Sequence, residues 1–197
     1  MSEVLIGIGG YAGAGKDTLA DLLVEHFSFV KIAFADPMRE IASVINPVVG
    51  FIDATDSKEC EVVRYNDAVE MLGYNMAKTI YPEIRQFLQR LGTEAGRNVL
   101  GTDIWVNDAM RRAKPHRRVV FPDMRFQNEA HVIRSANGRT VRVERHDVEV
   151  LNSHVSEHDL NGWAYDLFIH NNSAPIDMLT RMEQFFARSY TQVLRTS

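Results

Sequence analysis

A glycine-rich motif near the start of the chain constrains its fold more than any other feature. Residues 10–18 read Gly-Tyr-Ala-Gly-Ala-Gly-Lys-Asp-Thr, which is G-x-x-x-x-G-K followed by Asp17 and Thr18. An apolar run over residues 4–9 precedes the motif, and leucines at helical spacing follow it. Strand, glycine loop and helix in this order predict a phosphate-binding loop, because glycines let successive backbone N–H groups turn toward an anion. The alternative is a glycine-rich turn with a chance lysine, which the agreement of motif and context disfavours.

This loop is expected to bind the phosphates of a nucleoside triphosphate. The N-terminus of the following helix adds the positive end of its dipole, and Lys16 would reach the β- and γ-phosphates. The usual residue after the lysine is Ser or Thr, whose hydroxyl binds Mg²⁺, whereas this chain has Asp17. The residues predicted to bind the triphosphate are Gly10, Ala12, Gly13, Ala14, Gly15, Lys16, Asp17 and Thr18.

Composition narrows the class of protein. A chain of 197 residues with 45% apolar residues predicts a single domain with a sizeable core, and its length leaves room for a small inserted subdomain. No apolar run is long enough to span a membrane, no basic leader is visible, and Cys60 is the only cysteine, so we expect a cytoplasmic protein without disulfides or structural zinc. A net charge of −4 argues against general nucleic-acid binding, and we interpret the basic run at 111–118 as a solvated helix end.

Hydrophobic periodicity predicts an α/β fold in which helices cover both faces of a parallel sheet, because strands and helices alternate along the chain. Asp36 is expected to cap the second helix, with Pro37 in its first turn. Residues 48–82 are interpreted as an excursion from the core on the substrate side, with a polar, loop-like segment at 53–58 and one short helix ending near Gly73. Strands are predicted at 4–9, 29–35, 119–123, 139–145 and 165–170, and helices after the loop, at 36–45, 83–95, 104–112 and 128–136, and from Pro175 past Val193.

Two further segments carry candidate chemistry. Asp123 ends an apolar strand, where phosphate-loop proteins hold Mg²⁺, although a carboxylate there can also cap the next turn. Arg85, Gln89 and Thr93 lie four residues apart on the predicted helix at 83–95 and share one face. Such a face could clamp a phosphate and a base edge, or it could simply be solvated.

Several segments together resemble, in order, the deoxynucleoside monophosphate kinases of tailed phages. They are GYAGAGKDT at 10–18, FADPMR at 34–39, LQRLGTE at 88–94 with Arg97 and DIW at 103–105, DMRFQNE at 123–129, HVSE at 154–157 and DLFIHN at 166–171. The resemblance spans almost the whole chain. It implies a phosphate-loop kinase fold of the adenylate-kinase type, with ATP and Mg²⁺ as co-substrates and a deoxynucleoside 5′-monophosphate as acceptor.

The resemblance also implies roles for individual residues. Lys16, Asp17, Asp123, Arg125 and Arg145 would be catalytic, with Asp17 and Asp123 organising Mg²⁺. Residues 48–112 would form a helical acceptor-binding excursion and 146–162 a lid that excludes water. The predicted acceptor-binding residues are Asp36, Arg39, Arg85, Gln89, Thr93, Glu94, Arg97, Trp105, Arg125, Asn128 and Glu129.

Two other functions stay open at this point. Dephospho-CoA kinases have similar strands and a similar C-terminal D-x-x-I-x-N pattern, which here is carried by residues 166–171. A nucleotide-sensing switch would use the same loop without an acceptor. The arginines at 85–97 and 123–129 argue against a switch, because a switch needs no second anion clamp. The sequence leaves a homodimer open, and a phage origin would place the protein in the host cytoplasm.

Overall fold

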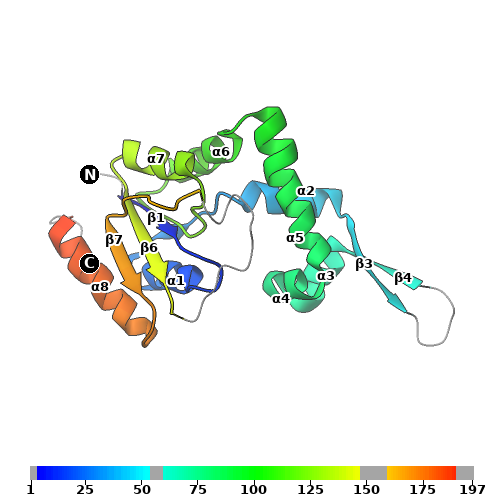
Figure 1. Cartoon of the computed structure of the whole chain (residues 1–197), viewed down its shortest axis with the longest axis horizontal. Coiled ribbons are helices and arrows are strands. Elements are labelled where there is room, and N and C mark those ends of the chain that lie inside the picture. The colour runs from blue at the N-terminus through cyan, green and yellow to red at the C-terminus, as the bar shows by residue number, and fades with distance from the viewer. Residues whose placement is uncertain (1–3, 54–59, 147–158, 190–197) are drawn as a thin grey trace. The chain divides into compact units, whose positions relative to one another are not determined.

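A parallel sheet carries the glycine loop at its centre (Figure 1). The computed structural model describes residues 4–53, 60–146 and 159–189. Within these residues the sheet has five strands in the order β2-β5-β1-β6-β7, and every neighbouring pair is parallel. All the carboxyl ends therefore lie along one edge, which is where ligands bind in open sheets of this kind. The strands are β1 (Val4–Gly9), β2 (Val30–Lys31), β5 (Arg118–Phe121), β6 (Arg139–Glu144) and β7 (Leu167–His170).

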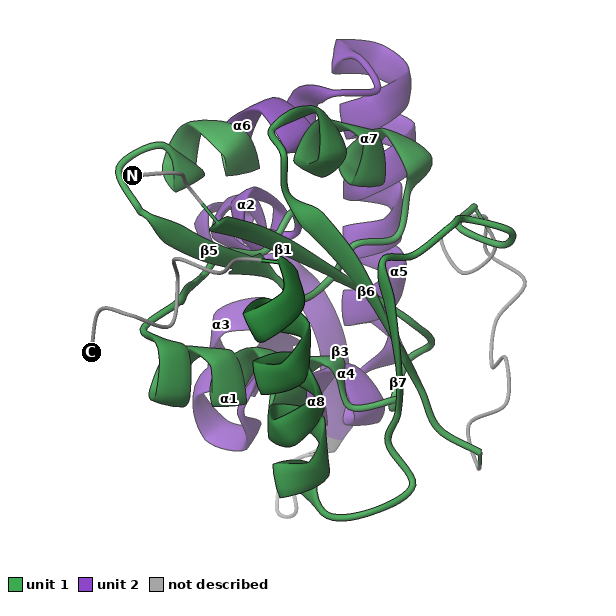
Figure 2. Cartoon of the chain, turned by 90° about the vertical axis from the view of Figure 1, so that its left-hand side faces the viewer, with its two compact units in different colours: residues 1–34, 109–197 green, residues 35–108 purple. Residues whose placement is uncertain are grey.

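Helices cover both faces of this sheet (Figure 2). Successive side chains of a strand point to opposite faces, so Ile6 and Ile8 lie on one face of β1 and Gly7 on the other. Ile6 and Ile8 belong to a buried cluster with side chains of α1 (Lys16–Phe27) and α8 (Pro175–Ser189). On the opposite face, α7 (Gln127–Ser135) brings the Ile133 side chain over Gly7, where a Cβ would lie only 2.5 Å from it.

Two compact units make up the chain, and each has its own core. Unit 1 comprises residues 1–34 and 109–197 and contains the sheet, and unit 2 comprises residues 35–108 (Figure 2). The core of unit 2 contains Val49, Val63 and Ile84, which come from three different elements. The elements of unit 2 are α2 (Asp36–Ile45), β3 (Val48–Asp53), β4 (Cys60–Arg64), α3 (Tyr65–Leu72), α4 (Tyr74–Ile80), α5 (Pro82–Gln89), η1 (Arg90–Leu100) and the first half of α6 (Ile104–Ala113).

The predicted α/β architecture is confirmed, and most predicted elements in unit 1 are present with ends shifted by a few residues. The second strand is much shorter than predicted: β2 has only two residues, at the edge of the sheet. Among the described residues no helix combines the length and apolarity that a bilayer crossing requires.

Unit 2 differs more from the sequence prediction. Residues 48–53 and 60–64 form an antiparallel pair of strands, and residues 74–80 form a helix. The sequence pattern predicts neither of these elements within the excursion. Phe51 and Ile52 of the strand pair are exposed, so its apolar residues do not follow the alternation that identifies a half-buried strand. The short helix ending at Gly73 is confirmed as α3.

Two boundaries in unit 2 are corrected. Ala35 occupies the N-cap position of α2, so Asp36 is the first residue of the helix and Pro37 the second. The helix predicted at 83–95 is α-helical only as far as Gln89, and residues 90–100 continue it as a π-helix. Most of the predicted lid (residues 147–158) and the predicted helical position Val193 lie outside the described residues.

Candidate nucleotide-binding site

The glycine loop joins the central strand β1 to α1 at the carboxyl edge of the sheet. Gly10, Gly13 and Gly15 have positive φ angles of 137°, 82° and 101°. Gly15 occupies the N-cap position of α1, and a Cβ there would lie 2.3 Å from the Asn171 side-chain nitrogen. Both its backbone angle and its surroundings therefore require glycine. The loop has the conformation that the phosphate-binding motif predicts, a turn opening directly onto a helix N-terminus.

Lys16 folds back over this loop. Its ammonium group donates hydrogen bonds to the carbonyl oxygens of Gly10 and Tyr11, each at 2.8 Å. The side chain is 9% exposed, so the charge is held close against the loop. The ammonium group therefore links the start of α1 to the first two residues of the loop.

Asn171 braces the loop from a neighbouring strand. Its side-chain amide donates to the Ala14 carbonyl at 2.9 Å, and its backbone N–H donates to the Glu144 carbonyl at 2.7 Å. Asn171 follows β7 directly, so one residue links the loop to the ends of β6 and β7. The sequence contained this residue in the D-x-x-I-x-N pattern, but no role was assigned to it.

Asp123 lies beside the start of the loop, as expected for a residue that follows the strand next to β1. The backbone N–H of the next residue, Met124, donates to the Ile8 carbonyl at 3.2 Å. The Asp123 carboxylate accepts a hydrogen bond from the Phe34 N–H at 2.9 Å. This bond ties the end of β5 to the segment that leaves β2, and it holds the carboxylate in a defined position.

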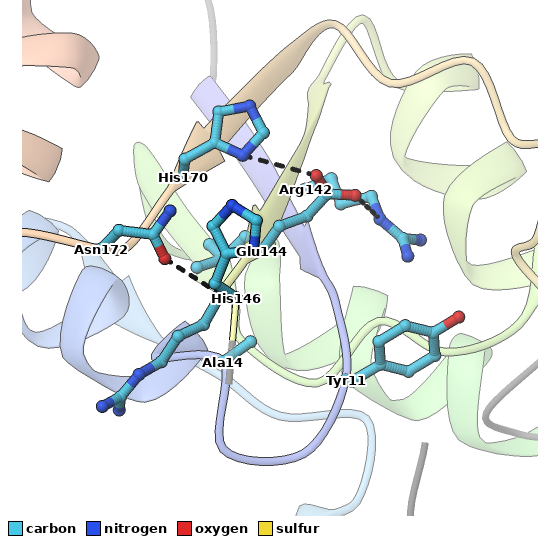
Figure 3. A pocket seen from close by; sticks show the side chains of 9 residues that line it. Tyr11, Ala14, Arg142, Glu144, His146, His170 and Asn172 are labelled. Carbon is cyan, nitrogen blue, oxygen red and sulfur yellow. Dashed lines mark hydrogen bonds and ion pairs between the residues drawn. The ribbon is translucent and has the colours of Figure 1, made fainter. Parts of the chain in front are cut away.

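A cavity of about 290 Å³ opens beside the loop, at the ends of β6 and β7 (Figure 3). The Glu144 carboxylate accepts from the Arg142 Nε at 2.8 Å, while the His170 Nδ1 lies 3.6 Å from its other oxygen. The His146 N–H donates to the Asn172 side chain at 3.0 Å. The cavity is lined by Tyr11, Ala14, Arg142, Val143, Glu144, Arg145, His146, His170 and Asn172.

Arg142 is a functional candidate that the sequence reading missed. Its guanidinium lies 5.2 Å from the Tyr11 ring centroid and 5.6 Å from that of Tyr165. Burial by itself would lower the pKa of Arg142, but the hydrogen bond to Glu144 and the nearby Tyr165 raise it, so the guanidinium stays charged. Arg142 also lines a smaller cavity together with Gly10 and the predicted catalytic Arg125. The spacing of Arg142 and Glu144, two apart on one strand face, was a usable signal.

Asp17 has a partner that the sequence did not indicate. Its carboxylate lies 2.9 Å from the Lys31 ammonium, which is also 3.0 Å from Asp21 on the next turn of α1. Burial opposes the charge on Lys31, but the hydrogen bonds to both carboxylates outweigh it and raise its pKa. The Asp17 side chain is 77% exposed. Asp17 therefore has a structural role, the ion pair with Lys31, in addition to its predicted role in Mg²⁺ binding.

Glu129 also has a structural role that the sequence prediction did not include. This residue is 3% exposed, and its carboxylate accepts from the backbone N–H groups of Arg125 at 2.7 Å and Phe126 at 3.0 Å. It caps the N-terminus of α7 and fixes the backbone that carries Arg125. Asn128 is half-buried in the same first turn.

The remaining predicted acceptor residues lie in unit 2. Arg39 pairs with Asp36 at 3.1 Å, and its guanidinium lies 4.7 Å from the Tyr74 ring centroid. The Lys78 ammonium lies 4.6 Å from the same ring. Arg85 and Gln89 lie on α5, Thr93, Glu94 and Arg97 on the π-helical segment, and Trp105 on α6.

Unit 1 thus brings together, at one edge of its sheet, the loop, Lys16, Asp123, Arg125 and Arg145, which lie far apart in the sequence. The described residues contain no group of three or more His, Cys, Asp or Glu side chains placed to hold a metal ion. Mg²⁺ does not require such a group, since it commonly binds one or two carboxylates together with waters and substrate phosphates. The half-buried Asp123 carboxylate beside the loop fits that donor set.

Comparison with known proteins identifies the family. The family model described as deoxynucleotide monophosphate kinase matches residues 45–182. A protein of Acanthamoeba polyphaga mimivirus, provisionally named a deoxynucleotide monophosphate kinase, is 27% identical over 94% of this chain and 93% of its own length. The deoxynucleoside-5′-monophosphate kinase of Escherichia phage T5 is 25% identical over 68% of this chain and 73% of its own.

Among solved structures, the shikimate kinase of Aquifex aeolicus covers 96% of this chain and 99% of its own, with a TM-score of 0.49 and 9% identity. A likeness of that size says nothing about the substrate. The family model, in contrast, spans more than half of the chain, including the turn with Asp123 and Arg125 and the cavity residues of β6 and β7. The chain therefore belongs to the deoxynucleotide monophosphate kinase family.

Proposed function

We propose that this enzyme transfers the γ-phosphoryl group of ATP to the 5′-phosphate of a deoxynucleoside monophosphate, releasing ADP and a deoxynucleoside diphosphate. The observation that carries this proposal is a phosphate-binding loop, closed by Lys16, in a chain whose family match runs from residue 45 to 182. Direct in-line transfer needs no covalent intermediate, because positioning and charge neutralisation supply most of the rate.

ATP would bind at the carboxyl edge of the unit 1 sheet. Lys16 would exchange the carbonyl oxygens of Gly10 and Tyr11 for phosphate oxygens, which form stronger, charge-assisted hydrogen bonds. Thr18 would contact an inner phosphate from the first turn of α1. Arg145 would neutralise charge on the transferring group, and its position in the cavity beside Ala14 and Asn172 supports this assignment.

Asp123 would organise Mg²⁺, with a contribution from Asp17, through bound waters. When bound, the ion supplies positive charge that stabilises the negative charge on the phosphates during transfer. The hydrogen bond from Phe34 restricts the Asp123 carboxylate before any ligand enters, which reduces the cost of ordering it.

The acceptor phosphate would bind Arg39, Arg85 and Arg125, and Asp36 would orient Arg39 through their ion pair. Gln89, Thr93, Glu94 and Arg97 would line the nucleoside site, with Trp105, Asn128 and Glu129 supporting it. We add Arg142 to the residues that would bind phosphate oxygens. The support is that Arg142 lines both cavities, the larger one together with Arg145 and the smaller one together with Arg125.

A coupled assay of ADP release over the four deoxynucleoside monophosphates, the ribonucleoside monophosphates and dephospho-CoA tests the proposal. We expect turnover with at least one deoxynucleoside monophosphate and none with dephospho-CoA. Turnover with dephospho-CoA alone would identify a dephospho-CoA kinase, and slow hydrolysis that no acceptor stimulates would identify a nucleotide switch.

Lys16→Ala is the matched variant for this assay. It should abolish turnover, because it removes the ammonium group that would bind the phosphates. It should keep the folded circular-dichroism spectrum, because the buried apolar cluster of unit 1 does not include Lys16. An active Lys16→Ala enzyme would contradict the proposed mechanism.

A further inference from the structure

One long helix in unit 2 changes partway along from α-helical to π-helical hydrogen bonding. It begins as α5 at Pro82, and from Arg90 to Leu100 it is a π-helix of 11 residues. Gln89 and Arg90 at the junction keep helical backbone angles, so the helix continues without a break. Most π-helical segments are single-turn bulges, and they occur frequently at functional sites. An 11-residue segment therefore needs a cause in its surroundings.

Glycines give the segment a face that packs unusually close to its neighbours. Gly92 and Gly96 are both buried. A Cβ on Gly92 would lie 2.6 Å from the Met38 sulfur, and a Cβ on Gly96 would lie 2.3 Å from the Trp105 ring. Met38 comes from α2 and Trp105 from α6. The backbone of the segment is thus held directly against two other elements.

Trp105 also bonds to the backbone of the segment. Its indole N–H donates to the Gly92 carbonyl at 2.8 Å, and the residue is only 4% exposed. A carbonyl oxygen has two lone pairs, so it can accept from a side chain as well as within the helix. A side-chain donor that enters a helix's hydrogen-bond ladder is a known cause of departure from regular α-geometry. At the other end, the Arg97 guanidinium donates to the Thr102 carbonyl at 3.0 Å.

The π-helical register changes which side chains share a face. In an α-helix residues five apart lie about 140° from each other around the axis, since a turn has 3.6 residues. In a π-helix the hydrogen bond joins residues five apart, which places them one above the other. Glu94 is therefore brought toward the face of Gln89 rather than away from it. Thr93, Glu94 and Arg97 are half-buried or exposed, whereas Gly92 and Gly96 are buried.

We propose that Trp105 is a positioning residue that sets this register and so assembles the polar surface on which the nucleoside of the acceptor binds. This rests on the proposed function. Gln89, Thr93, Glu94 and Arg97 together offer amide, hydroxyl, carboxylate and guanidinium groups, which suit the mixed donors and acceptors of a nucleobase edge. Trp105 acts through the backbone of Gly92 and needs no contact with the substrate.

The test compares the two tryptophans of the chain by replacing each with phenylalanine. Trp105→Phe keeps most of the ring and removes the N–H that bonds to Gly92. Trp163→Phe is the matched control, because the Trp163 N–H also bonds to a single oxygen, that of Thr140 at 3.3 Å, but in unit 1. We expect Trp105→Phe to raise KM for the deoxynucleoside monophosphate roughly tenfold, the effect of one buried hydrogen bond, and to leave KM for ATP unchanged. Trp163→Phe should change neither constant.

A second variant separates register from simple loss of packing. Gly96→Ala keeps the indole but pushes the Trp105 ring away from the helix, and it should raise the same KM. Equal changes in both KM values, or no change for the acceptor, would overturn the proposal.

Fluorescence distinguishes this proposal from the proposed function. In the Trp163→Phe enzyme Trp105 is the only tryptophan, and its emission should change on titration with deoxynucleoside monophosphates but not with ATP alone. Unchanged emission with every deoxynucleoside monophosphate would refute the positioning role. A change in emission without ADP release in the coupled assay would instead support the nucleoside site and reject the proposed reaction.

Discussion

At the scale of single residues, Asp17 can have two roles, one in binding Mg²⁺ and one in pairing with Lys31. It replaces the hydroxyl residue expected after Lys16, which suggests Mg²⁺ binding, yet its carboxylate pairs with Lys31 at 2.9 Å. Asp21 pairs with the same ammonium group at 3.0 Å and lies one turn further from the loop. The two residues therefore share the structural role and differ in distance from the phosphates.

This difference permits a sharp prediction. Asp17→Ser should raise the Mg²⁺ concentration for half-maximal activity by about tenfold, because residues that organise a bound ion have effects of that size or greater. Asp21→Ser should leave it unchanged, since it removes only a partner of Lys31. Activity titrated with Mg²⁺ at saturating ATP measures both. Equal behaviour of the two variants would mean that Asp17 serves only Lys31 and the helix N-terminus.

At the scale of elements, the loop depends on strands that are distant in the sequence. Asn171, just after β7, donates its side-chain amide to the Ala14 carbonyl and its backbone N–H to the carbonyl of Glu144 at the end of β6. The turn before α7 is fixed in a similar way, by the buried Glu129 carboxylate. The site is therefore positioned by the ends of regular elements, which keeps it more rigid than a loop alone could.

Asn171→Asp tests this bracing of the loop. The aspartate has nearly the same shape but cannot donate to the Ala14 carbonyl, and it places a negative charge beside the phosphates. We expect KM for ATP to rise at least about tenfold, the effect of one lost hydrogen bond plus charge repulsion. Asn137→Asp, at an exposed turn of unit 1, adds the same charge away from the loop and should have no effect. An unchanged KM in Asn171→Asp would show that the loop keeps its shape without this brace.

At the scale of the whole molecule, each compact unit has buried apolar side chains of its own among the described residues. Unit 2 is one continuous segment of the sequence, residues 35–108, and it interrupts unit 1. The two parts of unit 1 on either side of this segment contribute strands to the same five-stranded sheet. A fully buried residue of one core should therefore affect the stability of its own unit first. Ile84 in unit 2 and Ile169 in unit 1 are both 0% exposed.

Hydrogen exchange followed by mass spectrometry checks this. Ile84→Ala should cost about 2–5 kcal/mol of the stability of unit 2 and accelerate exchange within residues 35–108. Ile169→Ala should do the same within unit 1. If either variant accelerates exchange uniformly over both units, the two units unfold together in one cooperative step and have no independent free energies of unfolding.

The features that depend on local pattern are predictable from the sequence. The glycine loop, the strands of the sheet and most of its helices follow from residue spacing, because a strand or helix buries one face at a fixed period. Lys16 and Asp123 were identified in the same way, since a motif and a strand end fix where they lie. The ends of elements shifted, as for Asp36 at α2, because several nearby residues can satisfy a helix terminus.

The features that depend on contacts between distant residues follow only from the folded arrangement. The bond from Asn171 to Ala14 spans 157 positions, and the π-helical register is held by Trp105 and Met38 from other helices. The Arg142 cluster likewise joins the loop to β6 and to Tyr165. No local period encodes such contacts, because they form only when the sheet and the helices of each unit have brought separate segments together.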